Sequence, residues 1–123
     1  MKVKNYQELI VWQKAMLLVN LIYELCDKLP KVETFRLIQQ MIRAAISVPS
    51  NIAEGWSRNR PAELVRFFEF SYSSSCELET QTLIAKIRYP QIESEAEIIL
   101  NLITEIQKML FSLIKKNKSP SNY

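Results

Sequence analysis

A group of polar residues at the margins of two apolar helical patterns could do chemistry. Its members are Arg43, Asn51, Glu54, Glu77, Glu79 and Gln81. The three glutamates could form a carboxylate metal cluster or a general acid–base pair. The alternative is a structural network between helices, in which the arginine pairs with a carboxylate and the two amides bridge backbone groups.

The composition decides between these two interpretations. The chain has no histidine and a single glycine among its 123 residues. Without histidine there is no Ser-His or Cys-His nucleophile pair, no histidine-ligated zinc and no Glu-x-x-His di-iron site. A phosphate-binding loop needs at least two glycines. We therefore expect no catalytic residue, no metal and no cofactor, and we interpret the polar group as a structural network.

Four long segments with helical periodicity must position these residues. We expect helices at residues 8–29, 33–56, 61–89 and 94–116, followed by a polar tail at 117–123. Within each segment, apolar residues recur at spacings of three and four. Pro30 and Pro90 separate segments, and Pro61 suits the first position of a helix. Pro49 lies inside the second segment without disturbing its phase, so a kinked but continuous helix is expected there.

Two local signals predict helix ends. Gly55 is typical of a helix C-terminus, and Ser94 with Glu97 forms a capping-box pattern at the start of the fourth helix. The short connections force consecutive helices to run in opposite directions. The predicted fold is therefore all-α, an antiparallel up-down-up-down four-helix bundle that forms a single domain over residues 1–123.

The first and third helices carry more apolar residues than the core of one bundle can use. The residues outside the main stripe are Leu17, Leu21, Tyr23 and Leu25 in the first helix and Phe70, Tyr72, Leu83, Ile84 and Ile87 in the third. A second apolar face is typical of a subunit interface, whereas scattered exposed apolar residues are the alternative. We expect the chain to associate with itself.

The expected compartment follows from the cysteines and the apolar runs. Two cysteines, Cys26 and Cys76, are too few for a disulfide scaffold and are expected to be small buried residues. The N-terminus lacks the apolar region of a signal peptide, and no apolar run reaches the roughly 20 residues of a membrane span. We expect a cytoplasmic protein that does not enter a membrane.

The positive charge of the chain is unevenly distributed. The net charge is +3, and in an antiparallel bundle one end would collect eight of the 16 lysines and arginines. We call that end the basic pole; its cations are Lys2, Lys4, Arg58, Arg60, Arg66, Lys115, Lys116 and Lys118. These eight cations and the three carboxylates of Glu8, Glu54 and Glu63 give the pole a charge of +5.

The helix macrodipole accounts for only part of the basic pole. It favours the cations that end the second and fourth helices, but it disfavours Lys2, Lys4, Arg60 and Arg66, which lie near helix starts. A polyanion such as RNA or DNA would favour those four. A solvated charge cluster with no ligand is the alternative.

Three segments are more distinctive than the overall pattern. They are Leu9–Ala15 (LIVWQKA), Ile42–Gly55 (IRAAISVPSNIAEG) and Glu77–Gln81 (ELETQ), the last followed by Ile84 and Ala85. The chain resembles the four-helix-bundle proteins encoded within intervening sequences of bacterial 23S ribosomal RNA genes. It is also similar to the related accessory proteins of diversity-generating retroelements, which are basic pentamers that associate with a reverse transcriptase and with nucleic acid. The resemblance implies a ring-like homopentamer with no catalytic residues.

These observations lead to one functional hypothesis and one alternative. We expect a non-enzymatic homo-oligomer that binds structured RNA or another nucleic acid through the basic pole. The alternative is a protein-interaction scaffold, or an accessory subunit of a protein partner, with no direct contact to nucleic acid. An enzyme is the third hypothesis, and the sequence contains the fewest residues that would suit it.

Overall fold

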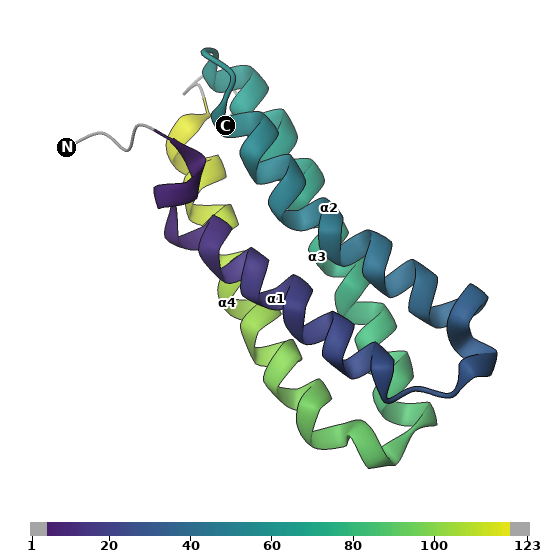
Figure 1. Ribbon diagram of the computed structural model, residues 1–123. Helices are drawn as coiled ribbons and strands as arrows, with labels where there is room; N and C mark the ends of the chain where they lie inside the picture. The colour runs from purple at the N-terminus through teal and green to yellow at the C-terminus, as the bar shows by residue number, and fades with distance from the viewer. Residues whose placement is uncertain (1–4, 119–123) are drawn as a thin grey trace.

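The computed structural model describes residues 5–118, and its long elements are four α-helices. Their bounds are α1 Ile10–Asp27, α2 Gln39–Trp56, α3 Pro61–Arg88 and α4 Glu93–Asn117 (Figure 1). There is no strand between residues 5 and 118. The predicted all-α, four-helix class is thus confirmed. Most of the predicted polar tail, residues 119–123, lies outside the described residues.

The connections place the ends of the helices at two opposite ends of the molecule. Figure 1 shows the α2–α3 connection at one end, together with the start of α1 and the end of α4. The α1–α2 and α3–α4 connections lie at the other end. The cations near the α2–α3 connection and those at the end of α4 therefore share one end of the molecule.

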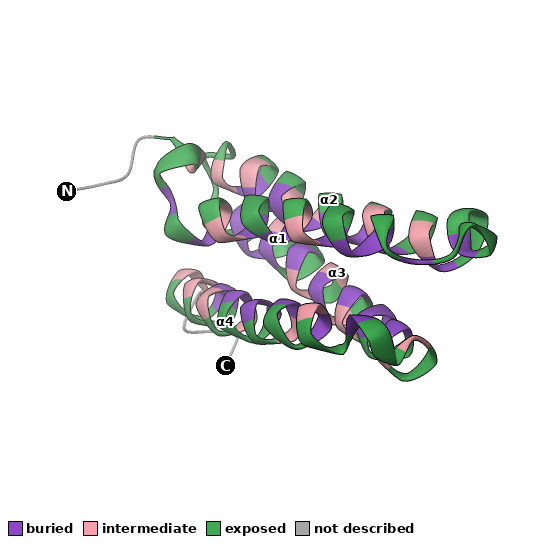
Figure 2. Cartoon of the chain, turned by 60° about the horizontal axis from the view of Figure 1, so that its bottom comes forward, coloured by how far each residue is buried: buried purple, intermediate pink, exposed green. Residues whose placement is uncertain are grey.

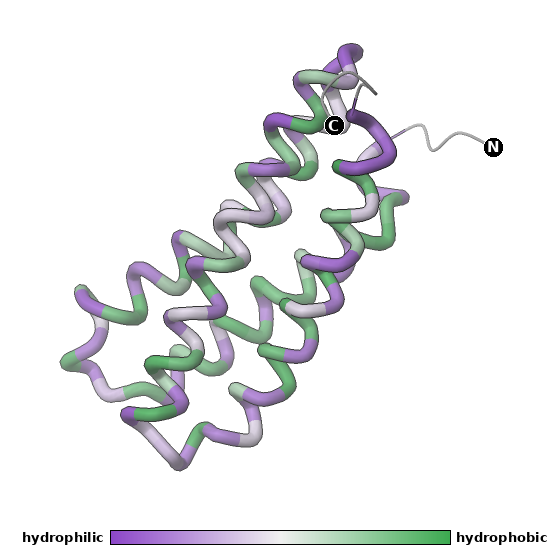
Figure 3. The backbone as a smooth tube through the Cα atoms, turned by 180° about the vertical axis from the view of Figure 1, so that it is seen from behind, coloured by the Kyte–Doolittle hydropathy of each residue, from purple (hydrophilic) through white to green (hydrophobic). Residues whose placement is uncertain are grey.

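Each helix turns its apolar stripe inward. Buried residues line the facing sides of the helices and exposed residues cover the outside (Figure 2), and hydrophobic and hydrophilic residues alternate along each helix (Figure 3). The largest fully buried side chains include Leu18, Ile22, Ile52, Phe68, Ile103 and Ile106. Leu25 is fully buried too, so it belongs to the core and not to the second apolar face on which we expected it. The burial of one large apolar side chain stabilises a fold by roughly 1.5–3 kcal/mol, so these stripes set the rotation of each helix about its axis. None of the helices within residues 5–118 is long and apolar enough to cross a membrane.

The segment before α2 departs from the expected helix. We expected α2 to begin near residue 33, but residues 31–38 form a 3₁₀ turn, η2 (Lys31–Glu33), and a π-helical turn, η3 (Thr34–Ile38). Glu33 and Leu37 are both buried. The hydroxyl of Tyr89, which follows α3, donates a hydrogen bond to the Glu33 carboxylate. This polar contact fixes the segment against the end of α3, and periodicity alone could not reveal it.

Helix α2 continues through Pro49, as its periodicity predicted. Proline has no backbone N–H to donate, and nearby side chains bond to carbonyl groups around it. Ser50 Oγ donates to the carbonyl of Ile46, and Asn51 Nδ2 donates to that of Ser47. Ser71 Oγ on α3 donates to the carbonyl of Val48 at 2.8 Å. The polar residues around Pro49 therefore support the backbone and join α2 to α3.

Helix α2 ends at Trp56, as expected, one residue after Gly55, but this glycine does not have the left-handed conformation of a C-terminal cap. It is buried in the last turn of α2, and its φ is not positive. A Cβ at this position would lie 2.9 Å from Phe67 Cβ, 3.0 Å from Phe68 Cδ1 and 3.2 Å from the carbonyl oxygen of Leu64. Gly55 is required because α2 and α3 approach closely here, which the local sequence does not encode.

The predicted capping box at the start of α4 is wrong as well. Helix α4 begins at Glu93, one residue before Ser94, and no side chain caps its N-terminus. Glu97 forms an ion pair with Lys86 on α3 instead of reaching back to the backbone. The carboxylate of Glu97 therefore pairs with a lysine of the neighbouring helix and not with the backbone of its own helix.

Candidate nucleic-acid interface

Six of the eight predicted cations of the basic pole lie within the described residues. The α2–α3 connection positions Arg58 and Arg60, and Arg66 follows on the second turn of α3. Helix α4 supplies Lys115 and Lys116 at its C-terminal end and Lys118 directly after it, as far as the structure describes the chain. An ion pair of 3.7 Å between Lys118 Nζ and Glu69 Oε2 connects this end of α4 to α3. The predicted residues Lys2 and Lys4 lie outside the described residues.

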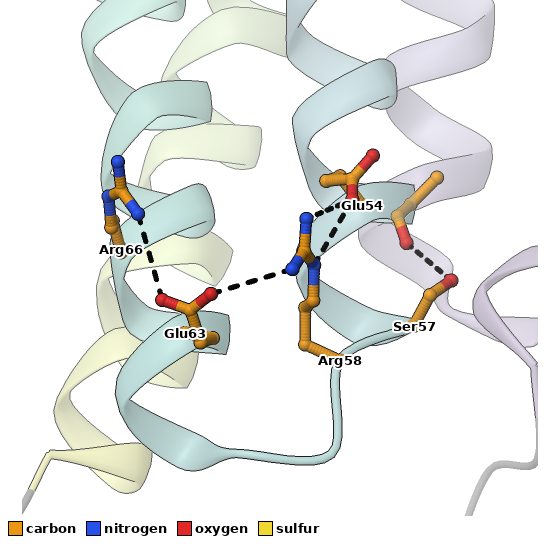
Figure 4. A network of polar contacts seen from close by, with 6 residues as sticks. Glu54, Ser57, Arg58, Glu63 and Arg66 are labelled. Atoms are coloured by element: carbon orange, nitrogen blue, oxygen red, sulfur yellow. Dashed lines mark hydrogen bonds and ion pairs between the residues drawn. The ribbon is translucent and has the colours of Figure 1, made fainter.

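Two arginines of the pole, Arg58 and Arg66, form a network with two glutamates (Figure 4). Arg58 donates from Nε and Nη2 to the same oxygen of Glu54, at 3.1 and 2.7 Å. Glu63 lies between the two arginines, with one oxygen 3.6 Å from Arg58 Nη1 and the other 3.7 Å from Arg66 Nη1. Two positive and two negative charges therefore cancel within this network.

Two phenylalanines that the charge analysis missed lie against the same arginines. The Arg58 guanidinium carbon is 5.0 Å from the centroid of the Phe67 ring. That of Arg66 is 5.8 Å from the Phe67 centroid and 5.5 Å from that of Phe70. The spacing of Arg66 and Phe70, four residues apart on one helix, is the signal that could have revealed part of this cluster.

The basic pole contains one more carboxylate than the sequence indicated. Glu69 pairs with Lys118 and lowers the predicted charge of the pole by one. Among residues 5–118 the six cations and the four carboxylates of Glu8, Glu54, Glu63 and Glu69 sum to +2, and Lys2 and Lys4 are not part of this sum. Arg60 and Lys116 are exposed, and within the described part of the chain neither side chain forms an ion pair, hydrogen bond or ring contact. These two residues carry the uncompensated charge.

Fewer cations than expected lie where the helix macrodipole disfavours them without a compensating carboxylate. Arg66, which seemed to face an unfavourable helix start, is compensated by Glu63 three residues earlier on α3. Arg60 occupies the N-cap position of α3 in an extended backbone conformation and has no such partner. Of the four cations whose position the dipole does not explain, Arg60 is the one that the described structure leaves uncompensated.

The opposite end of the molecule is held together by polar contacts between elements. Two ion pairs join α3 and the residue after α1 to the first turns of α4: Lys86–Glu97 and Lys28–Glu95. The hydrogen bond from Tyr89 holds the pKa of the Glu33 carboxyl below its ordinary value, and the same bond raises the pKa of the Tyr89 hydroxyl. We interpret this end as structural.

The polar group on α2 and α3 does not form the single network that the sequence predicted. Asn51 bonds to Ser47, whose hydroxyl lies 2.8 Å from that of Ser74 on α3. Glu79 accepts a hydrogen bond of 3.3 Å from Gln107 on α4. The interhelical bonds are thus made largely by serines and by a glutamine of α4, which the sequence analysis had not included in the group.

Three residues of the predicted network make no side-chain hydrogen bond or ion pair with its other members within residues 5–118. Glu54 belongs to the basic pole, as described above. Gln81 is buried, and its side-chain oxygen has no hydrogen-bond partner within residues 5–118. Arg43 is exposed in a groove of about 280 Å³ that Glu77 also lines, and it pairs with no described carboxylate. The predicted ion pair of Arg43 is wrong for the single chain, because this position of α2 faces away from the core.

The position of Arg43 predicts a small effect of its removal. We expect Arg43→Ala to change the free energy of unfolding by less than about 0.5 kcal/mol, as is usual for exposed residues without partners. A buried ion pair would instead cost roughly 3–5 kcal/mol when broken. Thermal unfolding of the variant measures the difference. A loss of several kcal/mol would show that Arg43 has a partner on another subunit.

The three carboxylates considered for chemistry are not brought together, and the two cysteines differ in burial: Cys26 is buried, whereas Cys76, which we also expected to be buried, is only partly so. Glu54, Glu77 and Glu79 have separate surroundings, and no cluster of three or more potential ligands within residues 5–118 could hold a metal ion. Burial, together with the nearby Asp27, raises the pKa of the Cys26 thiol to about 11. That thiol is protonated at neutral pH and is therefore a poor nucleophile.

Comparisons with known proteins agree with the fold and with the sequence patterns. The family model described as 23S rRNA-intervening sequence protein matches residues 7–112. A similar solved structure is that of a protein of unknown function from the S23 ribosomal protein family of Bacteroides thetaiotaomicron. Its TM-score is 0.79 at 23% sequence identity, over 86% of this chain and 99% of the other. A search of curated proteins gave no match. At this identity the solved structure supports the fold alone.

Proposed function

Because this chain belongs to the 23S rRNA-intervening sequence protein family, we propose that it is a non-enzymatic protein that binds structured RNA or another nucleic acid through its basic pole. The observation that supports this most is the pair of exposed, uncompensated cations Arg60 and Lys116 at one end of the molecule. Phosphate groups are the ligands that such cations bind by counterion release. We further propose that the protein acts in the cytoplasm and that its four helices form an antiparallel up-down-up-down bundle.

We also propose that the chain forms a homo-oligomer, a pentamer by its resemblance to the family. Exposed apolar residues on α1 and α3 support self-association: Leu17, Tyr23, Leu83, Ile84 and Ile87, the last 76% exposed. A ring of subunits would repeat the basic pole and so strengthen its field. Sedimentation equilibrium at micromolar concentration should then give a mass several times 14.4 kDa. A monomer under these conditions would contradict the proposed assembly.

The proposed contact with phosphates predicts how binding depends on salt. Arg60→Gln and Lys116→Gln should each weaken binding of all nucleic-acid sequences alike. Each lost contact should also reduce the slope of log K against log salt by about 0.7 to 0.9. Titrations of RNA at several salt concentrations measure both effects.

The matched control for these variants is Lys31→Gln. Lys31 is exposed in η2, at the end opposite the basic pole, and its side chain has no partner within residues 5–118. The Lys31→Gln variant should have the same affinity for nucleic acid, and the same slope of log K against log salt, as the wild type. If the Arg60 and Lys116 variants bind like the wild type, the site is elsewhere. If the wild type binds neither RNA nor DNA at low salt, nucleic acid is not its ligand.

A scaffold or accessory role is the second candidate, and one observation favours it. An apolar groove of about 520 Å³ lies between the start of α1 and the end of α4. Leu9, Ile10, Met109 and Leu113 line it, with Lys108 at its edge. Such a groove suits the apolar side chains of a partner protein. An accessory subunit would retain its partner when the basic pole is neutralised.

A further inference from the structure

The aromatic residues of the basic pole suggest which form of nucleic acid it takes. We infer that unpaired bases of a single strand stack on the surface formed by Arg58, Arg66, Phe67 and Phe70, which we call the arginine–phenylalanine surface. This inference rests on the proposed function, since it specifies the ligand of the same pole. It adds a class of ligand, single-stranded rather than duplex, and the side chains that select it.

The arginine–phenylalanine surface presents flat groups that are held in place and yet remain accessible. Phe67 and Phe70 meet edge to face, with ring centroids 5.7 Å apart and planes at 88°. Phe70 is 44% exposed although it is a large apolar residue. Glu54 and Glu63 pair with the two guanidinium groups, as Figure 4 shows. The same guanidinium groups lie over the rings of Phe67 and Phe70.

The charges of this surface argue against a contact made through phosphates alone. Arg58 and Arg66 are compensated by Glu54 and Glu63, so this part of the pole has no net charge to attract a phosphate. Its guanidinium planes and its exposed ring are nevertheless suited to stacking, because every base has a π-face. The uncompensated Arg60 lies two residues from Arg58 and would bind a neighbouring phosphate.

A single strand matches this combination better than a duplex does. Bases within a duplex are covered by their neighbours in the stack, so a protein that contacts its backbone meets phosphates and sugars. In a single strand or a loop the bases can turn outward and stack on aromatic rings or on guanidinium groups. A neutral stacking surface beside isolated cations is therefore an arrangement for unpaired nucleotides.

The test compares two probes and substitutes one ring. The probes are a fluorescein-labelled oligouridylate of about 12 nucleotides, comparable in length with known single-strand sites, and an RNA duplex of the same length. The wild type should bind the single strand more tightly at equal salt. Phe70→Leu keeps an apolar side chain but removes the ring, and it should weaken single-strand binding by roughly 5-fold or more, with no change for the duplex. Phe70→Tyr keeps the ring and should retain the affinity.

Phe35→Leu is the matched control. Phe35 is 85% exposed in η3 at the opposite end of the molecule, so its substitution should affect neither probe. Each variant should first show the sedimentation mass of the wild type, which separates a binding defect from a defect of assembly. Fluorescence anisotropy then gives the dissociation constants.

The outcomes separate the inference from the proposed function. If both probes bind equally well, or Phe70→Leu weakens both or neither, stacking of unpaired bases is wrong, while nucleic-acid binding by the pole stands. If neither probe binds at low salt, the proposed function and the inference both fail. The arginine–phenylalanine surface would then be better explained as a contact for a protein.

Discussion

Replacing Phe68 by alanine is expected to lower the free energy of unfolding by about 3–5 kcal/mol, the largest effect that we predict for a single side chain of this protein. Phe68 is fully buried on α3, and its ring lies beside Gly55 of α2. Removing the ring deletes apolar contacts and leaves a cavity that the surrounding helices fill only in part. Urea denaturation at a fixed protein concentration measures the loss, with the midpoint and the slope fitted separately.

The control for this substitution is Phe111→Ala on α4. Phe111 is an exposed phenylalanine, so its removal should cost far less, within about 0.5 kcal/mol. Equal losses for the two variants would mean that Phe111 is covered in the folded oligomer. A loss below about 1 kcal/mol for Phe68→Ala would contradict the packing of α3 against α2 described above.

Gly55→Ala is expected to destabilise the protein although alanine is the better helix former. Alanine in place of a helical glycine should by itself add about 1 kcal/mol of stability. Here the new Cβ would meet the Cβ of Phe67, the ring of Phe68 and the carbonyl oxygen of Leu64 at 2.9–3.2 Å. Overpacking of this kind costs roughly 1–3 kcal/mol, and one of these atoms belongs to the backbone and cannot rotate away. The cost of overpacking should therefore exceed the gain.

The sign of the change is what tests this interpretation. Ala53→Gly, two residues earlier on α2, should lose about 1 kcal/mol and so calibrates helix propensity at this end of α2. An increase in stability for Gly55→Ala would show that α2 and α3 do not approach closely at this position. Because Phe67 is one of the residues displaced, Gly55→Ala should also weaken single-strand binding if the arginine–phenylalanine surface is the site.

The residues around Gly55 and Arg58 connect the packing of the bundle with its proposed ligand. Gly55 allows the first turns of α3 to approach α2, and this approach brings the Phe67 ring under Arg58. Glu54, one residue before Gly55, holds the same arginine from the other side. Ile42–Gly55, one of the three segments that carry the family resemblance, therefore ends next to the basic pole.

The number and type of the helices were determined by the sequence by itself. The apolar residues of each segment recur with the period of an α-helix, and proline marks most of the breaks, so each helix can be predicted from residues close to one another in the chain. Burial of each large apolar side chain stabilises the fold by roughly 1.5–3 kcal/mol. The summed burial energy of a stripe therefore determines which face of each helix points inward. The collection of cations at one end follows from these helices and their short connections.

The tertiary structure alone decided which polar residues meet across helices. Glu54 and Arg58, four residues apart, and Glu63 and Arg66, three apart, have spacings that the sequence shows. The pair of Lys118 and Glu69 instead joins residues far apart in the chain, and since an exposed ion pair is worth only about 0–1 kcal/mol, charge alone could not identify it. Whether Gly55 ends a helix or admits a neighbouring one depends on Phe67 and Phe68, more than ten residues away. The same holds for the Phe67 ring beneath Arg58, whereas Arg66 and Phe70 are four residues apart on one helix. These contacts depend on how each helix is rotated and how closely it packs, which is fixed by the whole core and not by any local pattern.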